Sequence, residues 1–176
     1  MGRYNVWNPS TKQDQFTSGE MAVQFNEENQ TTVIKVGWTA DGAQKTGCYN
    51  THCPGFIQEQ TTGAWWLVAE GNVSIGYWPK ELVPALGSGA GYVYWGGRAQ
   101  ASDGVGPPMG SGERSLSVDG TSVNGYVEQP RYIDKNSNAL QPETVEVDMD
   151  CVQMYTERYY QEDNYLLFGG PGGDIC

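Results

Sequence analysis

The chain has 176 residues, 38% of them hydrophobic, and a formal net charge of −11, which fits one globular domain. A field of that sign repels phosphate backbones and anionic lipids, so we expect neither nucleic acid nor a membrane as a partner. No apolar run is long enough to span a bilayer, and the N-terminal stretch lacks the apolar core of a signal peptide. The excess of carboxyl groups makes the chain more neutral in acid, so an acidic working environment is compatible with its composition.

Short aromatic or β-branched runs bounded by Gly, Asn and Pro predict strands along the whole chain. Every second residue of Glu20–Phe25 is apolar, which is the period of a half-buried strand, and Gly71 and Asn72 form a plausible tight hairpin between two later runs. The predicted strands are Tyr4–Trp7, Glu20–Phe25, Thr32–Trp38, Gly55–Gln58, Ala64–Glu70, Val73–Trp78, Gly91–Trp95, Ser115–Val118, Asn124–Glu128, Val145–Cys151 and Asn164–Phe168.

Other segments fit this all-β reading. Only Pro79–Leu86 has a helical pattern, beginning with proline, and Ala101–Glu113 is rich in loop residues. The sequence contains no fixed-period repeat and no interdomain linker. It therefore predicts a single all-β domain over residues 1–176, an antiparallel β-sandwich that is closed or partly open.

The stretch KTGCYNTHCPGF contains Cys48, Cys53 and the one histidine of the chain, His52. It could be a metal site, a nucleophile with its base, or a disulfide. A zinc site needs about four nitrogen or sulfur ligands, and no second cluster with the usual spacing follows. An even number of cysteines fits disulfides in a secreted, extracellular protein. We therefore favour the disulfide, and by the same logic a second one between Cys151 and Cys176.

The sequence lacks the residues that most other classes of enzyme need. A serine or cysteine hydrolase needs a base near its nucleophile, and neither a second histidine nor a G-x-S-x-G motif is present. The glycine-rich segments GSGAG and GGPGGD do not fit phosphate-binding loops, so we expect no cofactor and no metal. Carboxylate chemistry remains, in a chain with 21 acidic residues. A glutamine can replace the acid of a carboxyl pair by donating a hydrogen bond.

Asn29 and Asn72 begin N-x-Ser/Thr sequons, which predict N-glycosylation of a secreted protein.

Six segments in order, TADGAQKTGCYNTHCPGF, GAWWL, GYWPKELVPAL, VYWGG, MGSG and LLFGGPGGDIC, closely resemble the neprosin family. These are plant secreted proteins with a β-sandwich peptidase domain, and the characterised members are glutamic endopeptidases that cut after proline. The resemblance runs from about Tyr4 to Cys176. It also implies the disulfide pairs Cys48–Cys53 and Cys151–Cys176.

The chain is shorter than the family pattern in two places. Gly37-Trp38 runs directly into Thr39, where the family has a further strand and loop, and only Glu59–Thr62 replace two further strands. The resemblance therefore implies that family strands are missing near residues 38–39 and 59–62.

The catalytic pair of the family is two glutamates, and our alignment places Gln15 and Val68 at those positions. The resemblance then implies a Gln15/Glu70 pair, because Glu70 lies two positions after Val68 and so on the same strand face. In that scheme Glu70 activates water and Gln15 holds the scissile carbonyl. Glu20 is a weaker substitute.

Aromatic residues could bind substrate, because flat rings stack on proline or on sugars. Trp66 and Trp78 are the candidates, although adjacent residues such as Trp65 and Trp66 face opposite sides of a strand.

The sequence thus leaves three hypotheses. The first is a secreted glutamic endopeptidase domain that cleaves proline-containing polypeptides in acid. The second is a non-catalytic module of the same fold that self-associates through sheet edges, and the third is a carbohydrate-binding sandwich.

Overall fold

The computed structural model describes residues 1–12, 14–40, 55–59, 61–69, 73–102, 104–114 and 124–174. Within these ranges the chain is all β, with antiparallel strands throughout and a single 3-10 turn, η2 (Pro84–Leu86), as its helical part. No helix of the described ranges is long and apolar enough to cross a bilayer. The predicted fold class is therefore confirmed.

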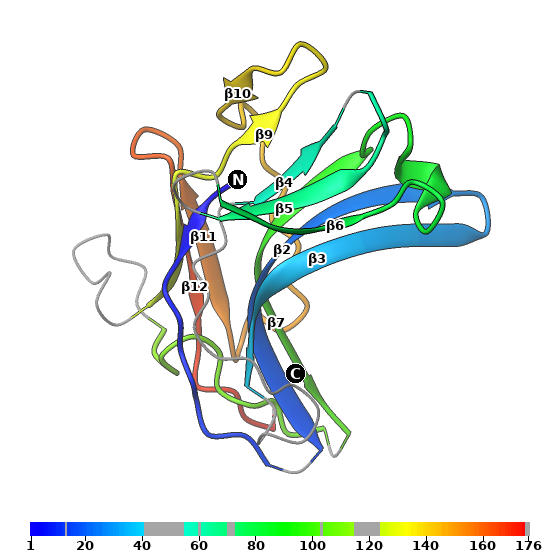
Figure 1. Cartoon of the computed structure of the whole chain (residues 1–176). Helices are drawn as coiled ribbons and strands as arrows, with labels where there is room; N and C mark the ends of the chain where they lie inside the picture. The colour runs from blue at the N-terminus through cyan, green and yellow to red at the C-terminus, as the bar shows by residue number, and fades with distance from the viewer. Residues whose placement is uncertain are drawn as a thin grey trace.

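The described strands form three sheets and one short ribbon (Figure 1). The central sheet has the order β3 (Gln30–Ala40), β2 (Gln15–Glu27), β7 (Tyr92–Ala101). The small sheet has the order β4 (Gly55–Gln58), β5 (Trp65–Ala69), β6 (Val73–Trp78). The four-stranded sheet has the order β1 (Arg3–Tyr4), β8 (Gly125–Glu128), β12 (Tyr165–Gly169), β11 (Thr156–Tyr160). The ribbon pairs β9 (Tyr132–Ile133) with β10 (Ala139–Leu140).

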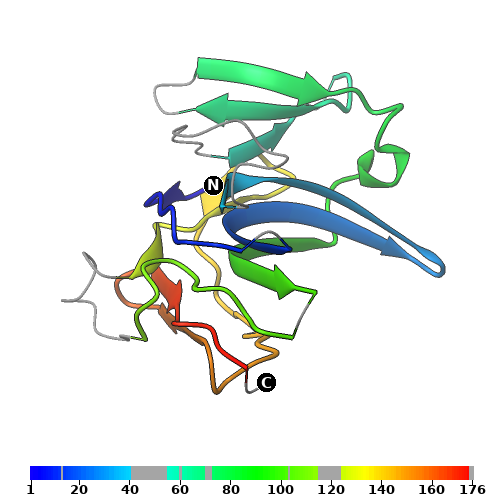
Figure 2. The ribbon, with the colours of Figure 1, turned by 90° about the horizontal axis from the view of Figure 1, so that it is seen from below.

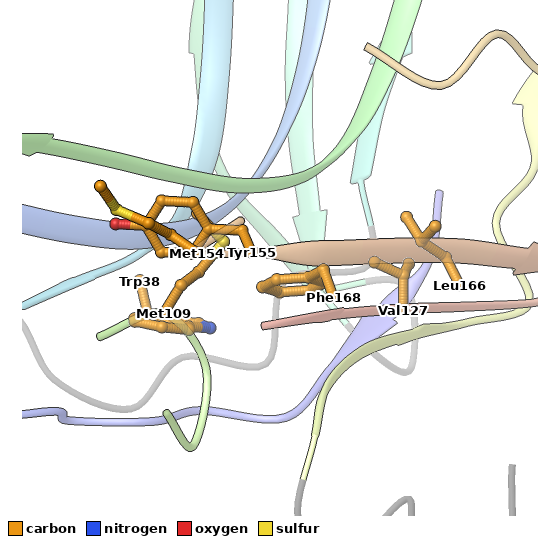
Figure 3. Close-up of a cluster of buried hydrophobic side chains, with 7 residues drawn as sticks. All are labelled: Trp38, Met109, Val127, Met154, Tyr155, Leu166 and Phe168. Atoms are coloured by element: carbon orange, nitrogen blue, oxygen red, sulfur yellow. The ribbon is translucent and has the colours of Figure 1, made fainter. Parts of the chain in front are cut away.

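The central sheet is strongly bent, and the other two sheets cover different halves of its convex face (Figures 1 and 2). Towards the small sheet, Met21, Val23 and Ile34 pack around Trp65, with Val83 and Leu86 completing the cluster. Towards the four-stranded sheet, Trp38 packs in a second cluster, shown in Figure 3. The other members of that cluster are Met109, Val127, Met154, Tyr155, Leu166 and Phe168.

The register of the central sheet is set by the hairpin between β2 and β3. Glu27 pairs with Gln30 across a two-residue turn, and from there the register places Glu20 opposite Gly37. A Cβ at Gly37 would overlap the carbonyl oxygen of Gly19, so only glycine allows the strands to approach this closely. The turn and this glycine together fix which side chains share each face.

Most predicted strands are present, often with longer bounds. The runs at Gly55–Gln58 and Val73–Trp78 match β4 and β6 residue for residue, whereas β2 and β3 extend well beyond their predicted cores. The Gly71–Asn72 turn, the predicted strand Ser115–Val118 and His52 lie outside the described residues. The predicted strand Tyr4–Trp7 is wrong beyond Tyr4, because the side chain of Asn5 bonds the backbone at Asn124, just before β8, and at Tyr126 in β8, in place of a ladder.

Two further expectations are wrong. Val145–Cys151 forms no strand, and the described elements leave Val145 and Val147 39% and 50% exposed, so the apolar alternation has no surface to pack against there. The segment Pro79–Leu86 contains turns and the brief η2, because Pro84 interrupts the helical hydrogen bonding that its apolar spacing favours. Strand β11 was not predicted, since its sequence TERYY is largely polar.

Candidate functional site

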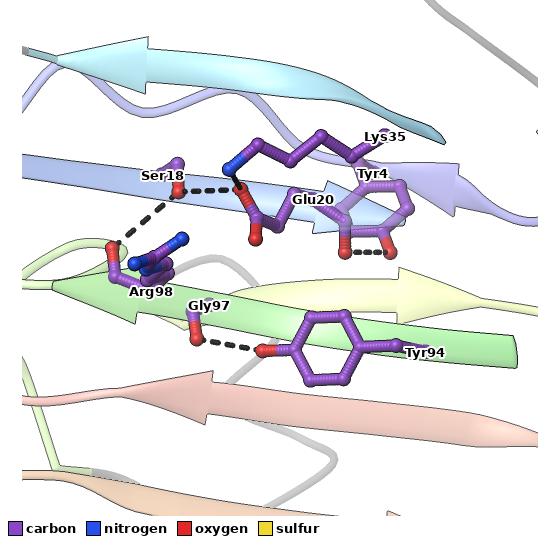
Figure 4. A network of polar contacts seen from close by, with 7 residues as sticks. All are labelled: Tyr4, Ser18, Glu20, Lys35, Tyr94, Gly97 and Arg98. Carbon is purple, nitrogen blue, oxygen red and sulfur yellow. Dashed lines mark hydrogen bonds and ion pairs between the residues drawn. The ribbon is translucent and has the colours of Figure 1, made fainter. Parts of the chain in front are cut away.

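The concave face of the central sheet carries a cluster of polar side chains. Residues directly opposite each other in an antiparallel pair point to the same face. Glu20 lies opposite Gly37 and Gly96, and its neighbours two positions along β2 lie opposite Arg98, Lys35 and Tyr94. The shared face therefore presents Ser18, Glu20, Lys35, Tyr94 and Arg98, as Figure 4 shows. We call these five residues, with Glu157, the polar cluster.

Glu20 is buried in the middle of this face, with 11% of its side chain exposed. Its Oε2 lies 3.2 Å from Lys35 Nζ and 3.2 Å from Ser18 Oγ. Ser18 Oγ is also 3.4 Å from the carbonyl oxygen of Arg98, so its single proton can serve either acceptor. Burying a charged carboxyl group is costly unless it is paired and hydrogen-bonded, and Lys35 and Ser18 meet that need.

A second carboxyl group, that of Glu157 on β11, reaches the same face from the four-stranded sheet. A Cβ placed on Gly96 would lie 2.8 Å from Tyr94 Oη and 3.6 Å from Glu157 Oε1. Because Gly96 is directly opposite Glu20, this position is on the Glu20 side of the sheet. Glu157 and Tyr94 thus converge on the space that a side chain at position 96 would occupy.

The local environment favours the neutral form of Glu157. Burial raises the pKa of Glu157 to about 7, and the nearby charge of Asp148 adds to the rise. Burial, and after it the charges of Glu157 and Glu20, also raise the pKa of Tyr94 well above the usual range of a phenol. Tyr94 therefore stays protonated, and its hydroxyl donates to the carbonyl oxygen of Gly97 at 2.8 Å.

Tyr4 supports the same site from the other side of β2. Its hydroxyl donates to the main-chain oxygen of Glu20 at 2.7 Å, and its ring packs against both hydrophobic clusters. Burial first, and then the neighbouring Tyr94, raise the pKa of Tyr4, so it too remains a neutral donor. The backbone that presents Glu20 is in this way anchored to the core.

The polar cluster therefore contains two carboxyl groups, and burial favours the neutral form of one of them, Glu157. A neutral carboxyl can donate a proton, and a carboxylate can accept one from water. Two cations, Lys35 and Arg98, belong to the same face of the central sheet. The arrangement has the parts that acid–base hydrolysis requires.

Gln15, predicted as the amide of the catalytic pair, has a different environment. It is 7% exposed at the start of β2 and faces away from Glu20, five positions along the strand. Its Nε2 donates to the carbonyl oxygen of Val105 at 2.7 Å, and its Oε1 accepts from the N–H of Lys12 at 3.0 Å. Both ends of the amide thus fasten neighbouring loops. Glu70 lies outside the described residues, so the Gln15/Glu70 pair stays a prediction.

The two predicted substrate-binding tryptophans lie on opposite faces of the small sheet. Trp78 is directly opposite Trp65 and packs against the core, whereas Trp66 is opposite Tyr77 on the outer face. The rings of Trp66 and Tyr77 are 4.8 Å apart, and Trp66 Nε1 donates to Glu59 at 3.4 Å. The expected opposition of Trp65 and Trp66 is confirmed. The structure does not bring Trp66 and Trp78 together.

The predicted modification sites are described only in part. Cys151 is disulfide-bonded, and Cys48, Cys53 and Cys176 lie outside the described residues, so the two pairings remain predictions. Asn29 is exposed in the turn between β2 and β3, a position accessible to a glycan, and Asn72 lies outside the described residues. Within the described ranges, no three His, Cys, Asp or Glu side chains come together as a metal site.

Sequence reasoning identified Glu20 only as a weak substitute and missed the rest of the polar cluster. A register built from the two-residue turn at Glu28–Asn29 would have placed Lys35 beside Glu20. No local signal links either residue to Glu157, which lies more than a hundred positions away on another sheet.

The fold and the polar cluster together define an antiparallel all-β protein whose candidate chemistry is that of carboxyl groups. A family model described as Neprosin matches residues 5–62 and 57–171, nearly the whole chain. The chain belongs to the Neprosin family, in agreement with the resemblance. The two matched segments overlap at residues 57–62, close to the point where that resemblance implies missing strands.

Proposed function

We propose that the chain is a secreted neprosin-type endopeptidase domain that hydrolyses proline-containing polypeptides in acid, with Glu20 and Glu157 as its carboxyl pair. The observation that carries this proposal is the approach of both residues to the same face beside Gly96, with the pKa of Glu157 raised to about 7. Membership of the family and the four cysteines support the substrate class and secretion.

The two carboxyl groups take opposite roles in this mechanism. Glu20, which contacts Lys35, accepts a proton from the water that attacks the scissile carbonyl. Glu157, neutral in acid, donates its proton to the leaving amide nitrogen. The guanidinium of Arg98 lies on the same face, where it can stabilise the negative oxygen that forms.

The pH dependence follows from Glu157. Its raised pKa keeps the proton in place throughout acid, so the donor is present at low pH and is lost as the pH rises through about 7. We therefore expect hydrolysis in acid that disappears above neutral pH.

The test is cleavage of a proline-containing peptide at pH 4 to 5, followed by mass spectrometry. Glu20→Gln and Glu157→Gln should each lower the rate by about a hundredfold or more, while Glu162→Gln, an exposed glutamate on the turn before β12, should not. Glu70→Gln tests the alternative pair that the resemblance implies, Gln15 and Glu70, and should leave the rate unchanged if Glu20 and Glu157 are the catalytic pair. Cleavage that survives both Glu20→Gln and Glu157→Gln would refute the roles given to them.

A non-catalytic, self-associating module is the second candidate, and two observations favour it. The Glu20 carboxylate is already engaged by Lys35 and Ser18 and is little exposed, which limits its access to water. Strand β6 is a sheet edge on which Val73, Ile75 and Tyr77 are 55%, 54% and 56% exposed. Such an edge is a template for pairing with another copy.

Sedimentation and the peptide assay distinguish the two candidates. A parent protein that cleaves no peptide, and forms dimers that Ile75→Lys dissociates, would establish the second function. A monomeric protein that cleaves would eliminate it.

A further inference from the structure

A pocket of about 560 Å³ lies between the central sheet, the small sheet and the β9 segment. Figures 1 and 2 show β9 beside β4, on the convex side of the central sheet. The polar cluster is on the concave side, so this pocket is separate from the proposed hydrolytic site. Its volume is within the roughly 300–1,000 Å³ typical of small-ligand sites.

The floor of the pocket is apolar. Met21, Val23 and Val93 come from the central sheet, and Trp65 comes from the small sheet. The indole N–H of Trp65 is already bonded to the carbonyl oxygen of Leu86, and the amide of Gln58 donates to the same carbonyl and to that of Gly87. The floor thus offers apolar contact surface for one side chain of a ligand.

One wall offers main-chain donors. The loop Gly87–Ala90 follows η2 and lines the pocket. The N–H groups of Gly87, Gly89 and Gly91 donate to carbonyl oxygens of the chain, and within the described residues those of Ser88 and Ala90 have no acceptor. Two unbonded N–H groups can bond a ligand that carries oxygen atoms.

The rim carries two cations and one carboxylate, and so a net positive charge. Arg131 and Lys135 line the pocket, and neither forms an ion pair with another described residue. The carboxylate of Asp134, between them, accepts from the N–H groups of Asn136 and Asn138 at 2.8 Å each and is committed to its own turn. In a chain with a net charge of −11, a rim that is net positive over an apolar floor favours an acidic group.

We propose that this pocket binds the C-terminal end of a polypeptide whose last side chain is apolar. The terminal carboxylate pairs with Arg131 and Lys135, the apolar side chain lies on the floor beside Trp65, and the peptide carbonyls accept from Ser88 and Ala90. A fatty acid shares the carboxylate and the apolar body. Its hydrocarbon chain, however, offers no acceptors to the N–H groups of Ser88 and Ala90, whereas the carbonyl groups of a peptide do.

Calorimetric titration of the whole chain with a synthetic peptide tests this proposal. The probe is an N-acetylated tripeptide ending in phenylalanine with a free carboxylate. Its C-terminal amide should bind at least about tenfold more weakly, because charge-assisted hydrogen bonds to the carboxylate are lost. Decanoate is the competing probe, and we expect it to bind more weakly than the peptide acid.

Variants assign the binding to this pocket. Arg131→Gln combined with Lys135→Gln should weaken binding of the peptide acid by about tenfold or more and leave binding of the amide unchanged. Ser88→Phe should weaken both peptides by filling the pocket. Lys12→Gln, which removes an exposed cation from the segment before β2, is the matched control and should bind like the parent. Thermal melting of each variant verifies that it is folded.

Three results would overturn the proposal. They are no binding of the peptide acid, equal binding of the acid and the amide, and binding of decanoate in preference to the peptide. Hydrolysis is not part of the readout, so inactive Glu157→Gln protein can be used, and failure of the proposed peptidase function leaves this test intact.

Discussion

On its convex face, β2 buries Met21 and Val23 against Ile34 and Trp65, whereas on its concave face it buries Glu20 beside Lys35. Both faces are shielded from water: Met21 is 1% exposed and Glu20 is 9% exposed. The first face is stabilised by apolar area removed from water, and the second depends on each charge keeping its partner. Burial of a residue therefore does not by itself show whether it serves the core or a site, and substitutions on the two faces should have different signatures.

The largest expected effect is on the convex side. Phe168→Ala removes a ring that is 2% exposed in the second hydrophobic cluster, and we expect a loss of about 3–5 kcal/mol in the free energy of unfolding. Urea denaturation at neutral pH measures it. Phe25→Ala, at the half-buried end of the hairpin, is the control and should lose clearly less. Equal losses would mean that the ring of Phe168 is not held as the structure shows.

On the concave side, the next effect depends on pH. The pKa of Glu157 is raised in the folded chain from 4.5 to about 7, so the folded state binds the proton more tightly than the unfolded state. The stability that this tighter proton binding gives the folded state is fully present below pH 4.5 and is lost as the pH rises from 4.5 through about 7. Relative to Glu157→Gln, the parent should therefore lose roughly 3 kcal/mol between pH 4 and 8. Urea denaturation across that range tests it, and parallel curves for parent and variant would contradict it.

A smaller loss is expected from breaking the Glu20–Lys35 ion pair. Lys35→Met leaves the buried Glu20 carboxylate with only Ser18, and we expect a loss of about 1–2 kcal/mol, reduced by the 47% exposure of the lysine side chain. The double variant Glu20→Met, Lys35→Met should recover stability, because no charge is then left unpaired. A double variant less stable than the single one would show that the pair itself stabilises the fold.

The smallest effect has the opposite sign. Thr17 is 0% exposed on the convex face, and its hydroxyl has no partner within the described residues. Thr17→Val removes an unsatisfied polar group and should raise the free energy of unfolding by about 1 kcal/mol. Thr39→Val, a half-buried threonine on the concave face, serves as the control. Destabilisation by Thr17→Val would indicate a bound water at that hydroxyl.

The strands that sequence reasoning recognised have a local cause. In Val73–Trp78 the aromatic and β-branched residues favour the extended backbone, so the prediction coincides with β6. Apolar and acidic residues alternate in Val145–Cys151, yet the segment is not a strand. A ladder also needs a partner strand, which residues far away in the sequence must supply. Strand β11 shows the converse: its polar residues are extended because β12 pairs with them.

The candidate site was less accessible to sequence reasoning. The alternation in Glu20–Phe25 predicted a strand with one solvent-exposed face that includes Glu20. Glu20 is nevertheless buried, because long side chains of β3 and β7 flank it. The raised pKa of Glu157 arises from burial and from the charge of Asp148, and burial by residues far away in the sequence leaves no local signal. Gln15 matched an expected position, but its role as a loop fastener depends on Val105 and became visible only in three dimensions.

The four-stranded sheet joins distant parts of the chain, since β8 lies between β1 and β12. Val127 of β8 is opposite Tyr4 on one side and Leu166 on the other. During synthesis the hairpin of β2 and β3 can form as soon as residue 40 has left the ribosome, but β8 has no complete set of neighbours until β12 follows. Folding therefore has an early local stage and a late closing stage. Until closure, the apolar convex surface around Trp38 stays uncovered, and in that interval a nascent chain depends most on chaperones.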